Sequence, residues 1–321
     1  MRSLLRRVPI PMAGLALGMA ALGNLLKIHS PEIRSVCGLV AAVLWCAVVA
    51  RILRYPEVSR RDLQNPIIAS VAATIFMTAM QLAVYAKSLI GDAAVYFWFA
   101  AVAMHAVYIL WFSRRFLRSF RLKSVYPTFF ITYVGIVVAS VTAPQFGMER
   151  LGTLIFWYGL AAYLVLLALI TLRYYRHPIP IAARPLFCIY TAPMSLCLTG
   201  YLCSCPDKSP LLLAIMGIGA QLMFLIVLCR LPRLLHLPFY PSYAAFTFPF
   251  VITAFGLQNL LAWFEGAGYA LPTLLHTLLL GEEVLAACLV VYAMVRYIRH
   301  ISCGLQDADW DYEECRWCCT G

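Results

Sequence analysis

The sequence has few charged residues. Only 12% of its 321 residues are Asp, Glu, Lys or Arg, whereas a soluble domain carries about 25%. Apolar residues make up 63%, and they form long continuous runs without an alternation of period two. Backbone polar groups find no water inside a bilayer, so a spanning segment is a helix or part of a closed barrel. The runs therefore predict an all-α integral membrane protein without room for a sizeable soluble domain.

The sequence signatures of enzymes are missing as well. It contains no His-Glu-x-x-His, Walker-type loop, nucleophile elbow or dinucleotide fingerprint. The twelve cysteines include no second pair at the spacing of a zinc site. We therefore predict no enzyme activity, no cofactor and no metal site.

Ten apolar stretches are long enough to cross a hydrocarbon core of ~30 Å, which requires roughly 20 residues. We place these spans, to within a few residues, at 8–28, 33–53, 66–86, 93–113, 127–146, 152–172, 185–205, 209–229, 242–264 and 272–298. They define a transmembrane domain at 1–302. The Cys- and acid-rich tail at 303–321 is predicted to be disordered and cytoplasmic, with soft-metal binding or palmitoylation as alternatives.

The basic residues are distributed unevenly between the two sides of this topology. Twenty of the 25 Lys and Arg fall on the side that holds both termini. This bias predicts a multi-pass cell-membrane protein with cytoplasmic N- and C-termini. The net charge of +11 then reflects topology and contact with anionic lipid, so no nucleic-acid partner is expected. The exceptions on the opposite side are Lys27, Arg34, Lys87, Arg150 and Lys208.

Prolines recur near the start of the odd spans, at 9, 66, 127, 185 and 241. The steps of 57, 61, 58 and 56 residues are each about the length of two spans with their loops. A fixed period indicates a repeated unit. The sequence therefore predicts one helical hairpin used five times.

Odd and even spans differ in polarity. Ser, Thr, Asn and Gln number 19 in the odd spans and eight in the even ones. Polar side chains are tolerated in a membrane where they face protein or a water-filled cavity. We therefore expect helices 1, 3, 5, 7 and 9 to surround a central pore; bonding of each hydroxyl to its own or a neighbouring helix is the alternative. The pore-lining candidates are Thr74, Thr78, Gln81, Thr132, Ser140, Thr191, Ser195 and Thr253.

Several helix openings resemble those of one transporter family. They are Pro9-Ile-Pro11 with Gly14, Gly18 and Gly23-Asn24, then Asn65-Pro66, Tyr126-Pro127-Thr128-Phe129-Phe130, Ala192-Pro193 with Gly200-Tyr201, and Ala245-Phe246-Thr247-Phe248-Pro249. In this order they resemble the tellurite-resistance/dicarboxylate transporter family, which includes the plant slow anion channels. The resemblance spans roughly residues 5–300.

The resemblance implies transport of small anions through a pore in each subunit of a homotrimer. The substrate class would be C4-dicarboxylate, sulfite, tellurite, nitrate or chloride. It also implies a phenylalanine gate on helix 9, at Phe248, with Phe246 as the alternative if the register slips. No Lys or Arg lies mid-span, so selection would depend on hydroxyls, helix-end dipoles and freed backbone groups, and it would favour weakly hydrated anions.

Glu282 and Glu283 form an acidic pair inside helix 10, and His276 lies one heptad before Glu283. Carboxylates in a membrane are costly and suggest a function. One interpretation is that Glu283 takes up a proton and makes the protein a proton-coupled carrier. The other is that it only packs helix 10 against a neighbour.

Two other functions stay open. A ten-helix drug or metabolite exporter would show an internal symmetry near 150 residues instead of 58. A membrane-embedded enzyme would bring Glu282, Glu283 and His276 into one closed polar cluster.

Overall fold

The computed structural model describes residues 5–118 and 120–303, and this part of the chain contains helices and no strand. Seven helical stretches are long and apolar enough to cross a membrane: Pro31–Arg54, Pro66–Phe116, Glu149–Arg176, Ile181–Ser204, Pro210–Leu228, Pro241–Gly266 and Thr273–Ser302. Met12–Leu26 and Gly135–Phe146 are shorter apolar helices. The chain is thus a helical, multi-pass membrane protein. The tail predicted to be disordered lies, beyond Cys303, outside the described residues.

Five inner segments are buried along most of their length. They are α2 (Met12–Leu26), α5–α6 (Pro66–Ala72, Thr74–Ile90), α8–η3–α9–η4 (Phe129–Tyr133, Gly135–Val137, Val138–Thr142, Ala143–Phe146), η5–α11 (Ile181–Thr191, Ala192–Ser204) and η6–α14 (Pro241–Phe246, Phe248–Gly266). In the apolar windows of Ile181–Ser204 and Pro241–Gly266, 83% of the residues are buried. These segments coincide with the odd spans that carry most of the polar side chains.

Five outer helices expose much more of their surface. They are α3 (Pro31–Arg54), α7 (Ala94–Phe116), α10 (Glu149–Arg176), α12 (Pro210–Leu228) and α15 (Thr273–Cys303). Only 28% to 33% of the apolar windows of α3, α10, α12 and α15 are buried. Their exposed side chains are large and apolar, as at Leu39, Leu154 and Ile218. Apolar surface of this extent is suited to lipid rather than to water.

Short helices connect these segments at their ends. They are α4 (Pro56–Asp62), η1 (Gly91–Ala93), η2 (Leu122–Ser124) and α13 (Leu231–Leu235).

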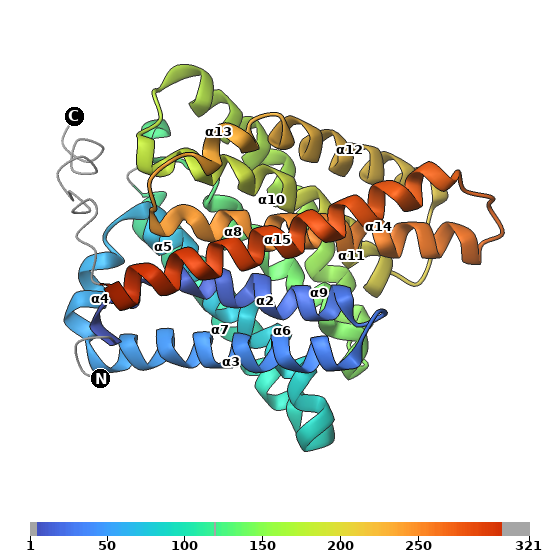
Figure 1. The fold of residues 1–321 in the computed structure, drawn as a ribbon, viewed down its shortest axis with the longest axis horizontal. Coiled ribbons are helices and arrows are strands. Elements are labelled where there is room, and N and C mark those ends of the chain that lie inside the picture. The colour runs from blue at the N-terminus through green and yellow to red at the C-terminus, as the bar shows by residue number, and fades with distance from the viewer. Residues whose placement is uncertain (1–4, 119, 304–321) are drawn as a thin grey trace.

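The inner segments form a closed ring. Helix α2 packs on α6, α6 on α9, α9 on α11, α11 on α14, and α14 again on α2. Each outer helix covers the joint between two inner segments: α3 packs on α2 and α6, α7 on α6 and α8, α10 on α9 and α11, α12 on α11 and α14, and α15 on α14 and α2. Figure 1 shows α2 between α3 and α15, which run along the outside.

Hydrogen bonds join equivalent positions of neighbouring inner segments. Their sequence separations of 57 to 60 residues match the proline steps. These bonds are Asn24–Gln81, Ser70–Thr128, Thr191–Pro249, Ser195–Thr253 and Ser242–Ala182. The period of the sequence is therefore also the period of the contacts between segments.

Four inner segments interrupt or change their helix type six or seven residues after their repeated proline, at Ala73, Val134, Thr191 and Thr247. The sequence predicts continuous helices here, and the difference has local causes. Pro193 and Pro249 lie in the first turn of α11 and α14, where a missing N–H ends the preceding hydrogen-bond pattern. In α5, the Ser70 hydroxyl donates to the Pro66 carbonyl at 2.7 Å, a bond that competes with helix bonding.

Candidate functional site

One cavity lies inside the ring at the end where the inner segments begin. All five inner segments line it, for example at Leu17, Met77, Phe130, Leu186 and Phe248. Among the described residues that line it, only the side chains of Thr74 and Ser242 are polar and none is charged. We call it the apolar cavity.

A second cavity lies at the opposite end of the same ring. It is lined by α2, α6, α9–η4, α11 and α14, together with Arg34 of α3. The polar side chains among its described lining residues are those of Asn24, Lys27, Arg34, Gln81, Thr142, Gln145, Gln258 and Asn259. None of the described lining residues is acidic. We call it the polar cavity.

The partition between the two cavities is thin. On each inner segment, the last residue of the apolar cavity and the first of the polar cavity are only three to seven positions apart. At 1.5 Å per residue this is about 5–10 Å of helix, against a hydrocarbon core of ~30 Å. The pairs are Leu17 and Ala21, Met77 and Gln81, Gly135 and Val141, Leu196 and Cys203, and Pro249 and Ile252.

Phe248 lines the apolar cavity next to this partition and is 6% exposed. It is the first residue of α14, directly after the interruption at Thr247. The Thr247 hydroxyl donates to the Gly14 carbonyl at 3.1 Å and to that of Ala244 at 2.7 Å. Gly18 allows α2 to approach, because a Cβ there would lie 2.6 Å from the Thr247 Cβ. The backbone at Phe248 is thus fixed against α2.

The two neighbouring phenylalanines face other parts of the bundle. The ring of Phe246 packs on Tyr243 at 4.9 Å, and that of Phe250 packs on Phe224 of α12 at 6.2 Å. Both are buried, and neither lines the apolar or the polar cavity. Of the three, only Phe248 lines the apolar cavity.

Arg34 is held in place at the polar cavity. Its Nε donates to the Asn24 side-chain oxygen at 3.1 Å, and its guanidinium lies 4.4 Å from the centre of the Tyr85 ring. Asn24 in turn donates to Gln81 at 2.8 Å, and the Tyr85 hydroxyl donates to the Ala20 carbonyl at 2.7 Å. The wall of the polar cavity therefore carries a positioned cation.

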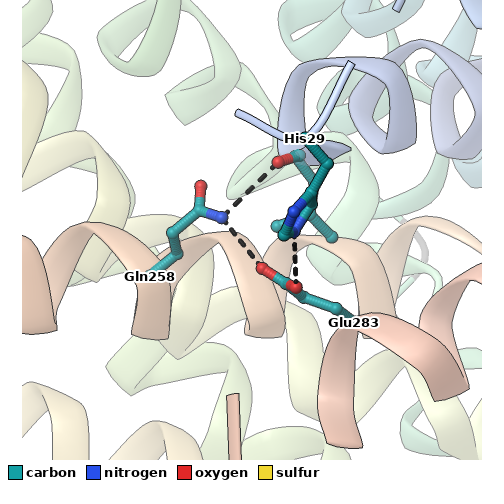
Figure 2. Close-up of polar contacts among 4 residues, drawn as sticks. His29, Gln258 and Glu283 are labelled. Carbon is teal, nitrogen blue, oxygen red and sulfur yellow. Dashed lines mark hydrogen bonds and ion pairs between the residues drawn. The ribbon is translucent and has the colours of Figure 1, made fainter. Parts of the chain in front are cut away.

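Glu283 of α15 contacts Gln258 of α14, a residue that lines the polar cavity (Figure 2). The Gln258 side-chain nitrogen donates to the Glu283 carboxylate at 2.9 Å, and the His29 ring nitrogen lies 3.1 Å from its other oxygen. Figure 2 shows the Gln258 amide oxygen pointing away from Glu283. Glu283 is 5% exposed. It therefore orients an amide that lines the polar cavity without lining the cavity itself.

The structure does not bring Glu282, Glu283 and His276 together. His276, in the first turn of α15, pairs with Glu265 near the end of α14 at 2.9 Å, and both side chains are exposed. Glu282 interacts with Gln221 of α12, although neither of its carboxylate oxygens makes a hydrogen bond within the described part of the chain. The closed cluster required by the enzyme alternative is not formed by these three side chains.

The predicted pore-lining residues have two kinds of environment. Thr74 lines the apolar cavity and Gln81 the polar cavity. The other six side chains line neither cavity and hydrogen-bond to backbone or to one another, and their pore-lining role stays a prediction. The bonds are Thr78 to Ala13, Thr132 to Ser70, Ser140 to Gly152, and Thr253 with Thr191 and Ser195.

A family of known proteins matches almost the whole chain. The model of the voltage-dependent anion channel family, SLAC1, matches residues 7–299. The chain belongs to this family. Family membership confirms the resemblance seen in the helix openings, and it assigns the chain to transporters that pass anions across a membrane through a channel. No curated protein matches the chain.

Membership in the voltage-dependent anion channel family argues against the exporter and enzyme alternatives. Apart from Gln81, the pore-lining residues predicted from the sequence do not include the cationic and amide residues of the polar cavity, chiefly Lys27, Arg34, Asn24 and Gln258. A usable signal was present, since Lys27 and Arg34 are two of the basic residues that run against the charge bias. Because Lys and Arg are uncommon on the non-cytoplasmic side of such a protein, the few that occur there are candidates for a functional role.

Proposed function

We propose that the protein conducts small anions through a path enclosed by the five inner segments and closed at Phe248. One observation carries the proposal: two cavities at opposite ends of the ring are each lined by all five inner segments, and about one to two helical turns separate them. A transport path requires access from both ends, and a closed state requires a short barrier between them.

The proposal includes ten membrane crossings arranged as five hairpins. The stretch Pro66–Phe116 contains 51 residues, which would extend about 75 Å as one helix, far more than a bilayer needs. It turns at Gly91, whose φ of 61° interrupts the helix. Counting it as two crossings, and adding Met12–Leu26 and the segment from Phe129 to Phe146, extends the seven long stretches to ten.

We propose Phe248 as the gate. An aromatic ring in a narrow passage blocks an ion because it excludes the water of hydration and offers no replacement ligand. Phe248 lines the apolar cavity whereas Phe246 and Phe250 do not, which supports this choice of register. A change of its χ1 rotamer would open the passage while α14 stays fixed through Thr247.

We propose that the two cavities divide the work of selection. Lys27 and Arg34 attract anions into the polar cavity, where no described acidic residue lines the wall. The apolar cavity offers no charge that could replace the hydration of a dianion. Weakly hydrated monovalent anions, such as nitrate and chloride, are therefore favoured over C4-dicarboxylate, sulfite and tellurite.

The orientation and assembly of the protein are further parts of the proposal. Both termini would face the cytoplasm of the cell membrane, so the apolar cavity would open inward. Three copies would form a homotrimer through their outer helices. Native mass spectrometry and labelling of cysteines placed in the loops would test these two statements.

A proton-coupled carrier is the second candidate function. It is favoured by Glu283, a buried carboxylate whose partner Gln258 lines the polar cavity. Gain or loss of a proton at Glu283 would change which group of the Gln258 amide faces the cavity. This mechanism would act on the same path.

The function is tested by anion flux with purified protein in liposomes. We expect uptake of nitrate and chloride that depends on the protein, with slower uptake of succinate. The Phe248→Ala variant should keep this order of anions at a higher rate. If neither the wild type nor Phe248→Ala passes any of the three anions, at either polarity of the membrane potential, the proposed function is wrong.

A further inference from the structure

A third cavity lies outside the ring, at the end of the bundle where the inner segments begin. It is formed by the end of α10, by η5 and by the corner of α12 and α13. Arg184, Arg230, Arg233 and His177 line it, and none of the described lining residues is acidic. Two stretches of the chain, 174–187 and 230–237, thus bring three guanidinium groups and an imidazole to one hollow.

The three arginines have no carboxylate partner. Arg51 at the same end of the bundle is paired with Asp62. By contrast, Arg184, Arg230 and Arg233 make no ion pair or hydrogen bond within the described residues, and all three are exposed. Guanidinium groups that converge on one hollow without a protein partner repel one another unless an anion joins them.

Aromatic side chains form one side of the hollow. The Arg230 guanidinium lies 5.9 Å from the centre of the Phe187 ring, and both residues line the cavity together with Tyr174. Behind this side of the hollow, the buried Arg173 donates to the His177 carbonyl at 3.3 Å. Aromatic contacts restrict the position of a guanidinium, so less ordering is needed when it binds a ligand.

We propose that this hollow binds a phosphate group, either of an anionic lipid headgroup or of a soluble phosphate. The planar fork of arginine matches phosphate oxygens two at a time, and three such forks suit a group with three or four oxygens. The hollow adjoins the apolar cavity, because both are lined by η5. Arg184 and Phe187 of η5 line the hollow, and Ala183 and Leu186 line the apolar cavity. The proposal does not depend on anion conduction.

Binding is measured on the purified full chain by native mass spectrometry and by thermal stabilisation. One set of samples is reconstituted in phosphatidylcholine with or without phosphatidylglycerol, and another receives inorganic phosphate in detergent. The variant is R184Q/R230Q/R233Q. Its matched control is R114Q/R115Q/R118Q, which removes three exposed arginines from the same end that line none of the three cavities.

We expect the control to keep the bound phosphate group and the variant to lose it. Each single substitution in the hollow should weaken binding about fivefold, the contribution of one basic residue near an anionic lipid surface. Retention of phosphatidylglycerol alone identifies a lipid ligand, and stabilisation by inorganic phosphate alone identifies a soluble one. Should R184Q/R230Q/R233Q be unstable, R184K/R230K/R233K keeps the charge but loses the planar forks that bind phosphate oxygens two at a time, so it should bind more weakly than the wild type and more tightly than the glutamine variant.

Equal loss of binding in the two triple glutamine variants would overturn the proposal, because it would mean that only the general surface charge attracts phosphate. Absence of binding by the wild-type protein in both sets of samples would overturn it as well. Conduction of anions by the same preparations serves as an independent readout. Failure of conduction with intact phosphate binding would count against the channel proposal alone.

Discussion

The apolar and polar cavities are built by the same five inner segments but differ in almost every other respect. The apolar cavity is formed by the first halves of the inner segments, four of which are irregular, and only two of its described lining residues, Thr74 and Ser242, have polar side chains. The polar cavity is formed by the second halves of the inner segments, which carry amides, and by Arg34 of the outer helix α3. In the proposed path, attraction of an anion and the barrier to its passage would therefore lie at different levels of one ring. Changes at one level should therefore leave the other intact.

The largest effect is expected from shortening the gate. Phe248→Ala removes the ring beside the partition and should raise anion conductance at least tenfold, since that corresponds to a barrier lowered by only ~1.4 kcal/mol. Single-channel or liposome recordings with nitrate and chloride measure it. Selectivity among anions should change little, because the polar cavity is untouched.

Phe250→Ala is the matched control for the gate. It removes the same side chain two residues further along α14, where the ring faces Phe224. Loss of a buried phenylalanine costs about 3–5 kcal/mol of stability, so its melting temperature should fall without a gain in current. If Phe250→Ala raised the current as much as Phe248→Ala does, the assignment of Phe248 as the gate would be wrong.

The next effect concerns the polar cavity. Arg34→Gln removes one positive charge and should lower nitrate conductance about fourfold at low salt, the attraction of one charge at ~5 Å in a water-like medium. The difference should shrink at high ionic strength through screening. Arg34→Lys keeps the charge and should retain most of the conductance. Arg150→Gln, an exposed site outside both cavities, should have no such effect; a fourfold loss there would assign the effect to overall charge.

A smaller effect on anion uptake is expected from Glu283→Gln, and none from the same change at the adjacent Glu282 of α15. Glu283→Gln removes a negative charge behind the polar cavity and should raise anion uptake by about fivefold at most, since a pair such as Glu283–His29, in which His29 is half exposed, contributes ~0.2–1 kcal/mol. Dependence of uptake on a proton gradient should disappear with it if the protein is a coupled carrier. Glu282→Gln is the control, because its side chain contacts no described residue of either cavity by hydrogen bond. If anion uptake by Glu283→Gln still depends fully on the proton gradient, Glu283 does not couple transport to protons.

The smallest functional effect is expected from the hydroxyl contacts between α11 and α14. Thr253→Val breaks the bonds to Thr191 and Ser195, which should destabilise the protein by about 1–3 kcal/mol. Conductance and selectivity should change by less than about twofold, a barrier change below ~0.4 kcal/mol. The measurement is a melting curve together with an anion panel. A clear change in anion selectivity would instead make Thr253 a pore-lining residue.

Much of the architecture follows from pattern. The proline steps anticipate the hydrogen bonds that join neighbouring segments at 57 to 60 residues, as between Asn24 and Gln81. The excess of hydroxyl and amide side chains on odd spans anticipates their burial. Pattern works here because a lipid environment leaves few positions for polar groups.

The local breaks and the long-range partners could not be predicted. Pro249 accounts locally for the change of helix type at Thr247, but the Thr247 hydroxyl donates to the Gly14 carbonyl of α2, which is 233 residues away. Glu283 meets His29 across 254 residues, so its role at the polar cavity was out of reach of any local pattern. The position of a hydroxyl on an inner segment also does not show whether it lines a cavity. The Thr132 hydroxyl, for example, donates to the Ser70 carbonyl of a neighbouring segment.

The most direct test of the central claim is the accessibility of two introduced cysteines from the two sides of the membrane. Thr74→Cys places a thiol in the apolar cavity and Gln81→Cys places one in the polar cavity, with the native Cys203 replaced by serine. We expect that a small methanethiosulfonate reagent reaches each thiol from one side of the membrane only and that these sides are opposite. In the Phe248→Ala variant, the reagent should reach both thiols from either side. Reaction of both thiols from the same side, or no added access in Phe248→Ala, would contradict a conduit closed at Phe248.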